Sequence, residues 1–347
     1  MSITDLVRPT RLAAPLLAAI FAWPLPALAE TAVHLKLDRK IDGPAAPFFV
    51  AIDKGYFKAE GLDVMIEAPA GEPDTAKLLA TSNYDMAVAD LNLLIELRDQ
   101  GATAARAMFV VFDKPPAAII ARRSRGLATP GDLAGKTLAA PANEAASAEW
   151  PIFAKVNGID PDKVMVEIVG LPVRDPMLAS GEVDAVTGNA FISYVDLKER
   201  GVPKDDLVVW QMADYGVELY GAAIVASETF IAEKPEAIRG FLRAYVKALK
   251  ETLRDPGAAI DSVLRRSDGA RKDVELERLR MAIADNIVTP AVRTRGFGAV
   301  DPARFATALD QLALTYRFKS RDKATASFDP SFLPPANERS VSNTASR

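Results

Sequence analysis

The sequence contains an internal repeat, and this repeat constrains the fold more than any other feature. Residues 79–90 align without gaps on residues 178–189, with Leu, Ala and Asp shared at equivalent positions. Two shorter matches lie upstream in the same order, at offsets of 97 to 100 residues: 61–63 with 158–160, and 64–67 with 164–167. Self-similarity at a nearly constant spacing is typical of chains built from similar structural units. The repeat therefore predicts two similarly built lobes.

Each predicted lobe alternates strands with helices. The expected strands of the first lobe are 33–38, 63–68 and 84–89, with one helix that ends near Gly61 and another at 73–82. The expected elements of the second lobe are strands at 136–140, 163–169 and 183–187 and helices at 144–157 and 174–180. Alternation of this kind favours an α/β fold with two open, mainly parallel sheets.

Two apolar stretches, 106–120 and 208–225, are interpreted as crossings between the lobes. The first lobe is then discontinuous, and two crossings form a hinge about which an interlobe cleft can close on a ligand. The predicted domains are a first lobe at 30–113 plus 217–334, a second lobe at 114–216, and a flexible polar tail at 335–347.

Residues 1–29 have the pattern of a cleaved export signal. Arg8 and Arg11 precede an apolar stretch at 12–23, and Ala27-Leu28-Ala29 supplies small residues for cleavage. A membrane anchor is the alternative, but a spanning helix needs about 20 apolar residues. We therefore expect export to the periplasm.

The composition argues against several classes of function. The chain has no cysteine and one histidine, His34, which falls on the polar face of the first predicted strand. Metal sites and cysteine–histidine catalysis usually need several such residues, so we expect neither a metal nor another cofactor, and no enzyme activity. The net charge is −4 without a basic run, so no nucleic acid partner is expected.

Candidate ligand-binding residues follow the predicted strands, because ligands of open α/β sheets bind beyond the carboxyl ends of the strands. Polar and aromatic side chains gather at these positions: Pro44, Phe48, Asp90, Asn92, Asn143, Glu144, Asn189, Phe191 and Tyr215. Asp90, Asn143 and Asn189 have an alternative role as helix caps.

Arg174 lies at a predicted strand-to-helix turn. Its guanidinium could hold a ligand carboxylate with two hydrogen bonds, or it could pair with Asp175 or Glu182 at the surface. The acidic candidates Asp90, Glu144, Asp214 and Glu218 favour a ligand with N–H donors or partial positive charge over a doubly charged anion.

Several segments resemble one branch of the ABC-importer substrate-binding proteins, the nitrate/taurine/sulfonate branch that includes carriers of thiamine-pyrimidine precursors. The segments are 43–48, 51–64 with its Gly-Tyr-Phe-x-x-x-Gly-Leu-Asp-Val block, 132–137 and 215–221. The resemblance implies a type II periplasmic-binding-protein fold. It also implies presentation of the cargo to an ABC permease with a cytoplasmic ATPase, and we expect the protein to be a monomer.

We therefore expect an extracytoplasmic solute-binding component of an ABC importer that takes a small heterocyclic or aromatic ligand. A sulfonate- or carboxylate-binding protein of the same class is one alternative, and a receptor that reports to a sensor kinase is another. Pyrimidine synthases of thiamine biosynthesis share the implied fold, but they carry a run of cysteines and use histidine chemistry. This sequence offers neither.

Overall fold

The computed structural model describes residues 30–69, 75–81 and 83–341. The predicted export signal at 1–29 lies outside this part of the chain. No helix in the described ranges is long and apolar enough to cross a lipid bilayer.

The first sheet has the strand order β2-β1-β3-β10-β4. Strand β1 is parallel to β2 and β3, whereas β10 is antiparallel to both β3 and β4. Its strands are β1 (Thr31–Lys36), β2 (Leu62–Glu67), β3 (Met86–Asp90), β4 (Arg106–Val110) and β10 (Ala222–Ala226). The first four strands share one direction, so the sheet is mainly parallel, as predicted.

The second sheet repeats this pattern with the order β7-β6-β8-β5-β9. Here β6 is parallel to β7 and β8, and β5 is the antiparallel strand between β8 and β9. Its strands are β5 (Ala117–Arg122), β6 (Thr137–Pro141), β7 (Met165–Val169), β8 (Ala185–Asn189) and β9 (Leu207–Gln211). The shared topology confirms the two similarly built lobes.

The antiparallel strand of each sheet arrives from the other lobe. The chain passes from β4 to β5 and returns from β9 to β10, which confirms a hinge of two crossings. The two crossings touch at Gly221, whose N–H donates to the Phe112 carbonyl at 3.0 Å. A Cβ atom at Gly221 would lie 2.8 Å from the Phe112 Cβ, so this close approach requires glycine.

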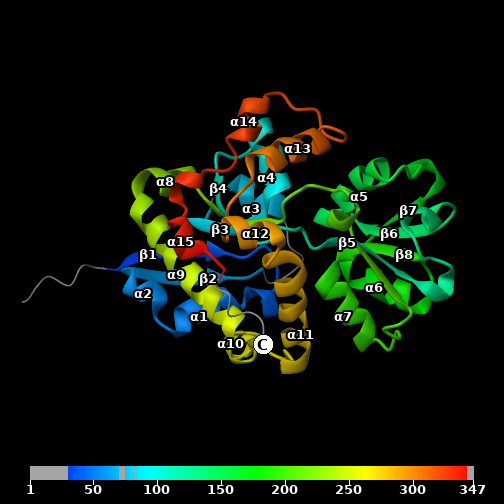
Figure 1. Ribbon diagram of the computed structural model, residues 1–347, viewed down its shortest axis with the longest axis horizontal. Helices are drawn as coiled ribbons and strands as arrows, with labels where there is room; N and C mark the ends of the chain where they lie inside the picture. Colours follow the sequence, from blue (N-terminus) through cyan, green and yellow to red (C-terminus); the bar gives the residue numbers. More distant parts are fainter. Residues whose placement is uncertain (1–29, 70–74, 82, 342–347) are drawn as a thin grey trace, which may run out of the picture.

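Fifteen α-helices of the described chain surround the two sheets. Figure 1 shows α5, α6 and α7 around the second sheet and the later helices α8 to α15 around the first. The helices between β1 and β4 are α1 (Ala46–Asp53), α2 (Tyr56–Ala59), α3 (Thr75–Thr81) and α4 (Leu91–Gln100). Those of the second lobe are α5 (Ala145–Val156), α6 (Leu171–Ser180) and α7 (Ala190–Glu199). The remainder are α8 (Glu228–Glu233), α9 (Pro235–Arg254), α10 (Pro256–Leu264), α11 (Lys272–Ala282), α12 (Pro290–Arg295), α13 (Pro302–Leu312), α14 (Arg321–Thr325) and α15 (Ala336–Arg339).

Helix α9 anchors the core of the first lobe because its apolar residues recur at helical spacing and bury one face. The ring of Phe241 stacks on Phe57 with centroids 4.7 Å apart, and Tyr245 packs on Phe48 at 4.5 Å. The buried face of α9 therefore packs against aromatic residues of α1 and α2.

A second core joins the lobes beside the hinge. Leu91 and Leu94 of α4 belong to the same buried cluster as Trp150 and Phe153 of α5. Helices α4 and α5 therefore contribute to one apolar cluster, although they belong to different lobes.

The predicted flexible tail is wrong for residues 335–341. Residues 336–339 form α15, and Arg339 is buried with an exposed fraction of 7%. Its guanidinium donates to the carbonyls of Pro334 and Phe297 at 2.7 and 2.6 Å. Three hydrogen-bonding nitrogens on one side chain can satisfy several carbonyls, and this fixes the segment on the first lobe. The predicted boundaries at 113/114 and 216/217 fall in the two crossings and stay predictions.

Candidate functional site

Asp90 and Asn189 occupy the same position in the two lobes. Asp90 ends β3 and caps α4, with its carboxylate accepting from the Leu93 N–H at 2.9 Å. Asn189 ends β8 and caps α7, accepting from the Ile192 N–H at 3.4 Å. The alternative role of both residues as helix caps is confirmed, and their contact with a ligand stays a prediction.

The Asp90 carboxyl has an unusual protonation equilibrium. Burial, together with the charge of Asp38, raises its pKa to about 6, against the hydrogen bonds from Leu93 and Asn92, which lower it. The neighbouring Glu96 on α4 has a pKa raised to about 7 by burial and by Asp90. The first lobe thus holds several carboxyl groups beside the start of α4.

Asn143 and Glu144 precede α5, and the prediction for one of them is corrected. Glu144, rather than Asn143, is the N-cap residue of α5, while Asn143 is exposed in the preceding turn. The alternative of Asn143 as a helix cap is therefore wrong. The Glu144 carboxylate instead accepts from Arg174 at 2.6 Å.

Arg174 is the centre of a buried polar network. Its exposed fraction is 2%, and it donates to Asp175 at 2.8 Å and to Ser193 at 2.6 Å as well as to Glu144. Burial alone would lower its pKa, but the charges of Glu144 and Asp175 raise it above the usual value.

The predicted pairing of Arg174 with Asp175 is correct, but its predicted location at the surface is wrong. Its other predicted partner, Glu182, instead accepts from Ser180 at 2.8 Å. All three guanidinium nitrogens of Arg174 are engaged by the protein, and the group joins the starts of α5, α6 and α7.

Four other candidates are placed in packing roles. Asn92 is buried and donates to the Tyr220 carbonyl at 2.8 Å. Phe48 packs on Tyr245, as described above. Pro44 lines a small cavity of about 10 Å³ together with Asp38, Arg39 and Asp42 of the β1–α1 loop. Tyr215 is half-buried in the β9–β10 connection and packs edge-on against Phe153 at 5.9 Å.

Phe191 of α7 connects the lobes. Its side chain is fully buried in a cluster that belongs mainly to the first lobe, and its ring lies 5.8 Å from that of Phe112. The Arg39 guanidinium lies over both rings, 5.4 Å from Phe112 and 6.0 Å from Phe191. Arg39 also pairs with Asp38 and Asp42.

A row of ion pairs continues this contact along α7 and α11. Asp196 pairs with Arg278, Lys198 with Glu277, and Glu199 with Arg271. Figure 1 shows α11 beside α7, between the two lobes. On the side of α7 and α11, the second lobe therefore meets the first through one buried ring and three partly exposed ion pairs.

Glu149 is the residue that our sequence reasoning missed. It lies on α5 with an exposed fraction of 3%, and neither carboxylate oxygen has a hydrogen-bond partner among the described residues. Burial raises its pKa well above the usual value, and the negative charge of Asp90 raises it further. The Glu149 carboxyl group of the second lobe therefore lies within electrostatic range of the Asp90 carboxyl group of the first lobe.

A signal for Glu149 was present in the sequence. The buried face of α5 includes Ala146, Trp150 and Phe153, and position 149 falls on the same face at helical spacing. A glutamate on an apolar stripe is unusual, because charged side chains are almost never fully buried unless they are paired. Helical periodicity in 145–156 could have identified it.

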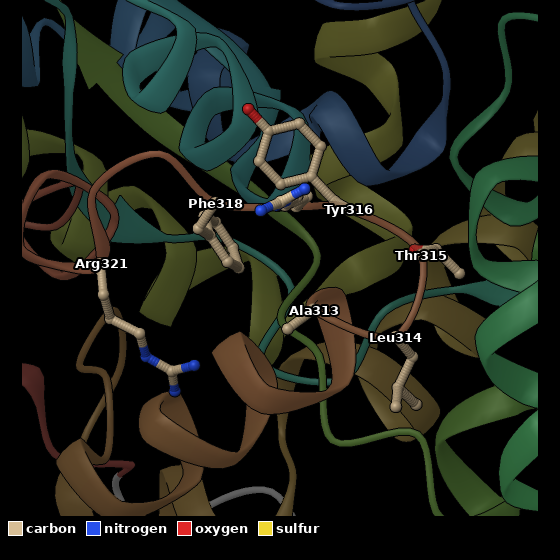
Figure 2. A pocket seen from close by; sticks show the side chains of 7 residues that line it. Ala313, Leu314, Thr315, Tyr316, Phe318 and Arg321 are labelled. Carbon is tan, nitrogen blue, oxygen red and sulfur yellow. The ribbon is translucent and has the colours of Figure 1, made fainter.

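A larger hollow lies away from all of these residues. Its volume is about 570 Å³, and it is formed by the connection between α13 and α14 (Figure 2). Among its lining residues, Tyr316 donates to Asp99 at 2.9 Å and Arg321 to Asp310 at 2.7 Å. None of the predicted site residues lines it.

Comparisons with known proteins place the chain in a family. Residues 44–259, more than half of the chain, match the family described as NMT1/THI5 like. The riboflavin-binding protein RibY of Chloroflexus aurantiacus is 28% identical over 221 residues, which cover 62% of this chain and 61% of that protein. The match thus spans about three fifths of that relative's length. The formylaminopyrimidine-binding protein of Halalkalibacterium halodurans is 27% identical, covering 68% of this chain and 72% of the relative.

Some relatives are named as enzymes. The 4-amino-5-hydroxymethyl-2-methylpyrimidine phosphate synthase of Aspergillus parasiticus is 25% identical over 62% of this chain and 65% of its own.

Among solved structures, the periplasmic aliphatic sulphonate-binding protein SsuA of Escherichia coli is similar in fold. Its TM-score is 0.67 at 14% identity, over 88% of this chain and 94% of SsuA. At this identity the likeness shows the fold alone, which is that of type II periplasmic binding proteins. By its family match and its two five-stranded lobes, the chain belongs to the NMT1/THI5-like family.

Proposed function

We propose that this protein is the extracytoplasmic solute-binding component of an ABC importer, which holds a small nitrogen heterocycle or aromatic compound between its lobes. The fold and the hinge of two crossings support this proposal, because such a hinge lets two lobes close on a ligand. The names of two relatives, a riboflavin-binding and a formylaminopyrimidine-binding protein, also support it, since both names denote nitrogen heterocycles.

One observation carries the choice of ligand class. Asp90 and Glu149 come from different lobes, and Glu149 has no protein partner among the described residues. Arg174, the side chain with which an anionic ligand would most readily pair, is already engaged by Glu144, Asp175 and Ser193. Carboxyl groups accept from N–H donors, whereas a sulfonate would be repelled by them. The site therefore favours a ligand with N–H donors over the sulfonate or carboxylate alternative.

We propose a receptor rather than an enzyme, although several relatives are named as synthases. The chain has no cysteine, and its one histidine, His34, is exposed on β1 beside the edge strand β2. A synthase mechanism that relies on histidine chemistry would need that side chain at the interlobe site.

We further propose that residues 1–29 direct export and that cleavage follows Ala29. The mature protein would then act as a monomer in the periplasm and present its ligand to a permease with a cytoplasmic ATPase. Mass spectrometry of the native protein would give an amino terminus at Glu30, whereas an intact Met1 would contradict export by a cleaved signal.

Calorimetry and thermal shift on the mature protein test the binding function. The panel contains pyrimidines, flavins, aromatic acids and sulfonates, and the proposal predicts micromolar or tighter affinity for a nitrogen heterocycle, which is about −8 kcal/mol. Small-angle X-ray scattering with the bound compound should show a smaller radius of gyration. Failure of the whole panel would contradict the receptor role, and preference for a sulfonate would contradict the ligand class.

A further inference from the structure

We infer that Glu149 and Asp90 form a subsite for a cationic N–H group of the ligand, such as an amidinium, a guanidinium or a protonated aminoheterocycle. This inference rests on the proposed function, and it adds that the ligand is recognised through positive charge. The two carboxyl groups come from opposite lobes, so the charged group would lie between them.

Glu149 lies in a buried and largely apolar environment. Its helix, α5, packs against β5 and β8, and the adjacent Trp150 belongs to the apolar cluster that joins the lobes. Both carboxylate oxygens are shielded from solvent without a hydrogen bond from the described residues. A carboxylate in such surroundings is strongly destabilised unless it meets a donor or a cation. Within the described residues, the two carboxylate oxygens of Glu149 are thus left to be satisfied by a bound molecule or by a proton.

The two arginines of the predicted site and of the β1–α1 loop are already engaged by carboxylates of the protein. Arg174 is held by Glu144 and Asp175, and Arg39 by Asp38 and Asp42. The charge that acts on Glu149 is that of Asp90, which is negative. Asp90 in turn interacts with the negative charges of Asp38 and Glu96, so the charge that reaches Glu149 is not offset at Asp90 by a positive one.

An organic cation fits this pair of carboxyl groups better than a metal ion does. Among the described residues, no group of three or more His, Asp or Glu side chains is placed to hold a metal ion. Organic cations with several N–H groups need fewer carboxylates, because each N–H⁺ donates a charge-assisted hydrogen bond. A planar cation can donate to Glu149 from one edge and to Asp90 from another.

The position of the pair also gives binding a conformational consequence. Without a ligand, the carboxyl groups of Asp90 and Glu149 repel each other when both ionise, and this repulsion between groups of different lobes opposes closure. A cation between them reverses the sign of that interaction and favours the closed arrangement. A ligand that binds the closed state better shifts the population toward it.

Matched pairs of charged and neutral compounds test this inference on the mature protein. Benzamidinium is compared with benzamide, and 4-aminopyridinium with aniline, by thermal shift and calorimetry at pH 8. We expect the cation of each pair to bind at least about tenfold more tightly than its neutral counterpart.

Two conservative variants locate the effect. Glu149→Gln and Asp90→Asn should each reduce cation affinity at least about tenfold while leaving binding of the neutral compounds nearly unchanged. Asparagine is also a good helix cap, so Asp90→Asn keeps the start of α4. Glu182→Gln is the control on the same lobe, because Glu182 is exposed and bonded to Ser180, and it should bind as the wild type does.

The outcomes separate this inference from the proposed function. If the neutral member of each pair binds as well as the cation, or if Glu149→Gln keeps the preference for the cation, the subsite is overturned. If a neutral pyrimidine or flavin binds with micromolar affinity but no cation does, the subsite is also overturned while the receptor role stands. If no compound of either panel binds, both proposals fail.

Discussion

Glu149 is a buried residue whose ionised side chain destabilises the folded protein, while the same side chain is proposed to bind the ligand. A carboxyl group without partners in the interior has a raised pKa, because burial disfavours its charged form. Glu149 favours the folded state most below about pH 4.3, which is the pKa of a glutamate in the unfolded chain. This contribution to the free energy of unfolding is lost as the pH rises toward the pKa of Glu149 in the folded protein. Glutamine has the same shape and carries no charge.

We therefore expect Glu149→Gln to stabilise the unliganded protein by about 1–3 kcal/mol at pH 8. The gain should shrink toward zero near about pH 3.5, where most of the wild-type side chain is protonated in both states. Urea unfolding at the two pH values measures this difference, with Glu182→Gln as the control. A less stable Glu149→Gln at pH 8 would mean that the carboxylate has a partner in the folded protein.

Arg174 is the opposite case, a buried charge with every partner in place. Arg174→Met should lower the free energy of unfolding by about 3–5 kcal/mol, because Glu144 and Asp175 are then left buried and unpaired. Arg321→Met removes an exposed pair with Asp310 and should cost no more than about 1 kcal/mol. Urea denaturation compares them, and equal losses would contradict the structural role of Arg174.

At the scale of elements, the contact between α7 and α11 holds the lobes together on one side. It combines the buried ring of Phe191 with three ion pairs that are partly exposed. Exposed pairs contribute about 0.2–1 kcal/mol each and weaken in salt. Three of them could therefore shift the equilibrium between open and closed lobes several-fold.

Charge reversal in this row should open the molecule. Lys198→Glu places like charges at the Glu277 position, so the distance between the lobes should increase, and adding Glu277→Lys should restore it. The absence of native cysteines allows labels at Met65→Cys and Met165→Cys, equivalent edge-strand positions that are both 63% exposed. Energy transfer between the labels reports the distance. No change in the single variant, or no recovery in the double, would contradict this role.

The elements also show where sequence periodicity succeeds and where it fails. The prediction of a helix at 144–157 matches α5 (Ala145–Val156), and the strand at 84–89 overlaps β3 (Met86–Asp90). The crossing segments were read as connections, yet they contain β4, β5, β9 and β10. Strands β5 and β10 lie inside the sheets, whereas β4 and β9 lie at their edges. All four are mostly buried, so they lack the alternation of polar and apolar residues that marks a half-buried strand.

At the scale of the whole molecule, the pH should control the separation of the lobes. The pKa of Asp90 is raised to about 6, so this group gains charge as the pH rises from 5 to 8. Burial and the charge of Asp90 raise the pKa of Glu149 well above its usual value, so Glu149 ionises at a higher pH than an ordinary glutamate. Asp38 and Glu96 add negative charge on the side of the first lobe, while Arg39 is engaged by its own carboxylates.

We expect the unliganded protein to open as the pH rises through this range, with a larger radius of gyration at pH 8 than at pH 5. Small-angle X-ray scattering measures this, and Glu149→Gln should reduce the change. A radius that is constant with pH, or one that decreases, would show that the two carboxyl groups do not act across the lobes.

The two-lobed α/β architecture follows from local information in the chain. The repeat between residues 79–90 and 178–189, and the alternation of strand and helix periods, are properties of short segments and their spacing. For the same reason the equivalent positions of Asp90 and Asn189 could be predicted as strand ends and helix caps.

The partners of the charged groups depended instead on which distant segments meet. Arg174 could have faced a ligand or the surface, and only the approach of α5 and α7 to α6 provides Glu144 and Ser193 as its partners. Glu149 and Asp90 are 59 positions apart, and the hinge brings them into range. The energy of a charge depends on the solvent and the charges around it in space, and periodicity along a chain carries little of that information.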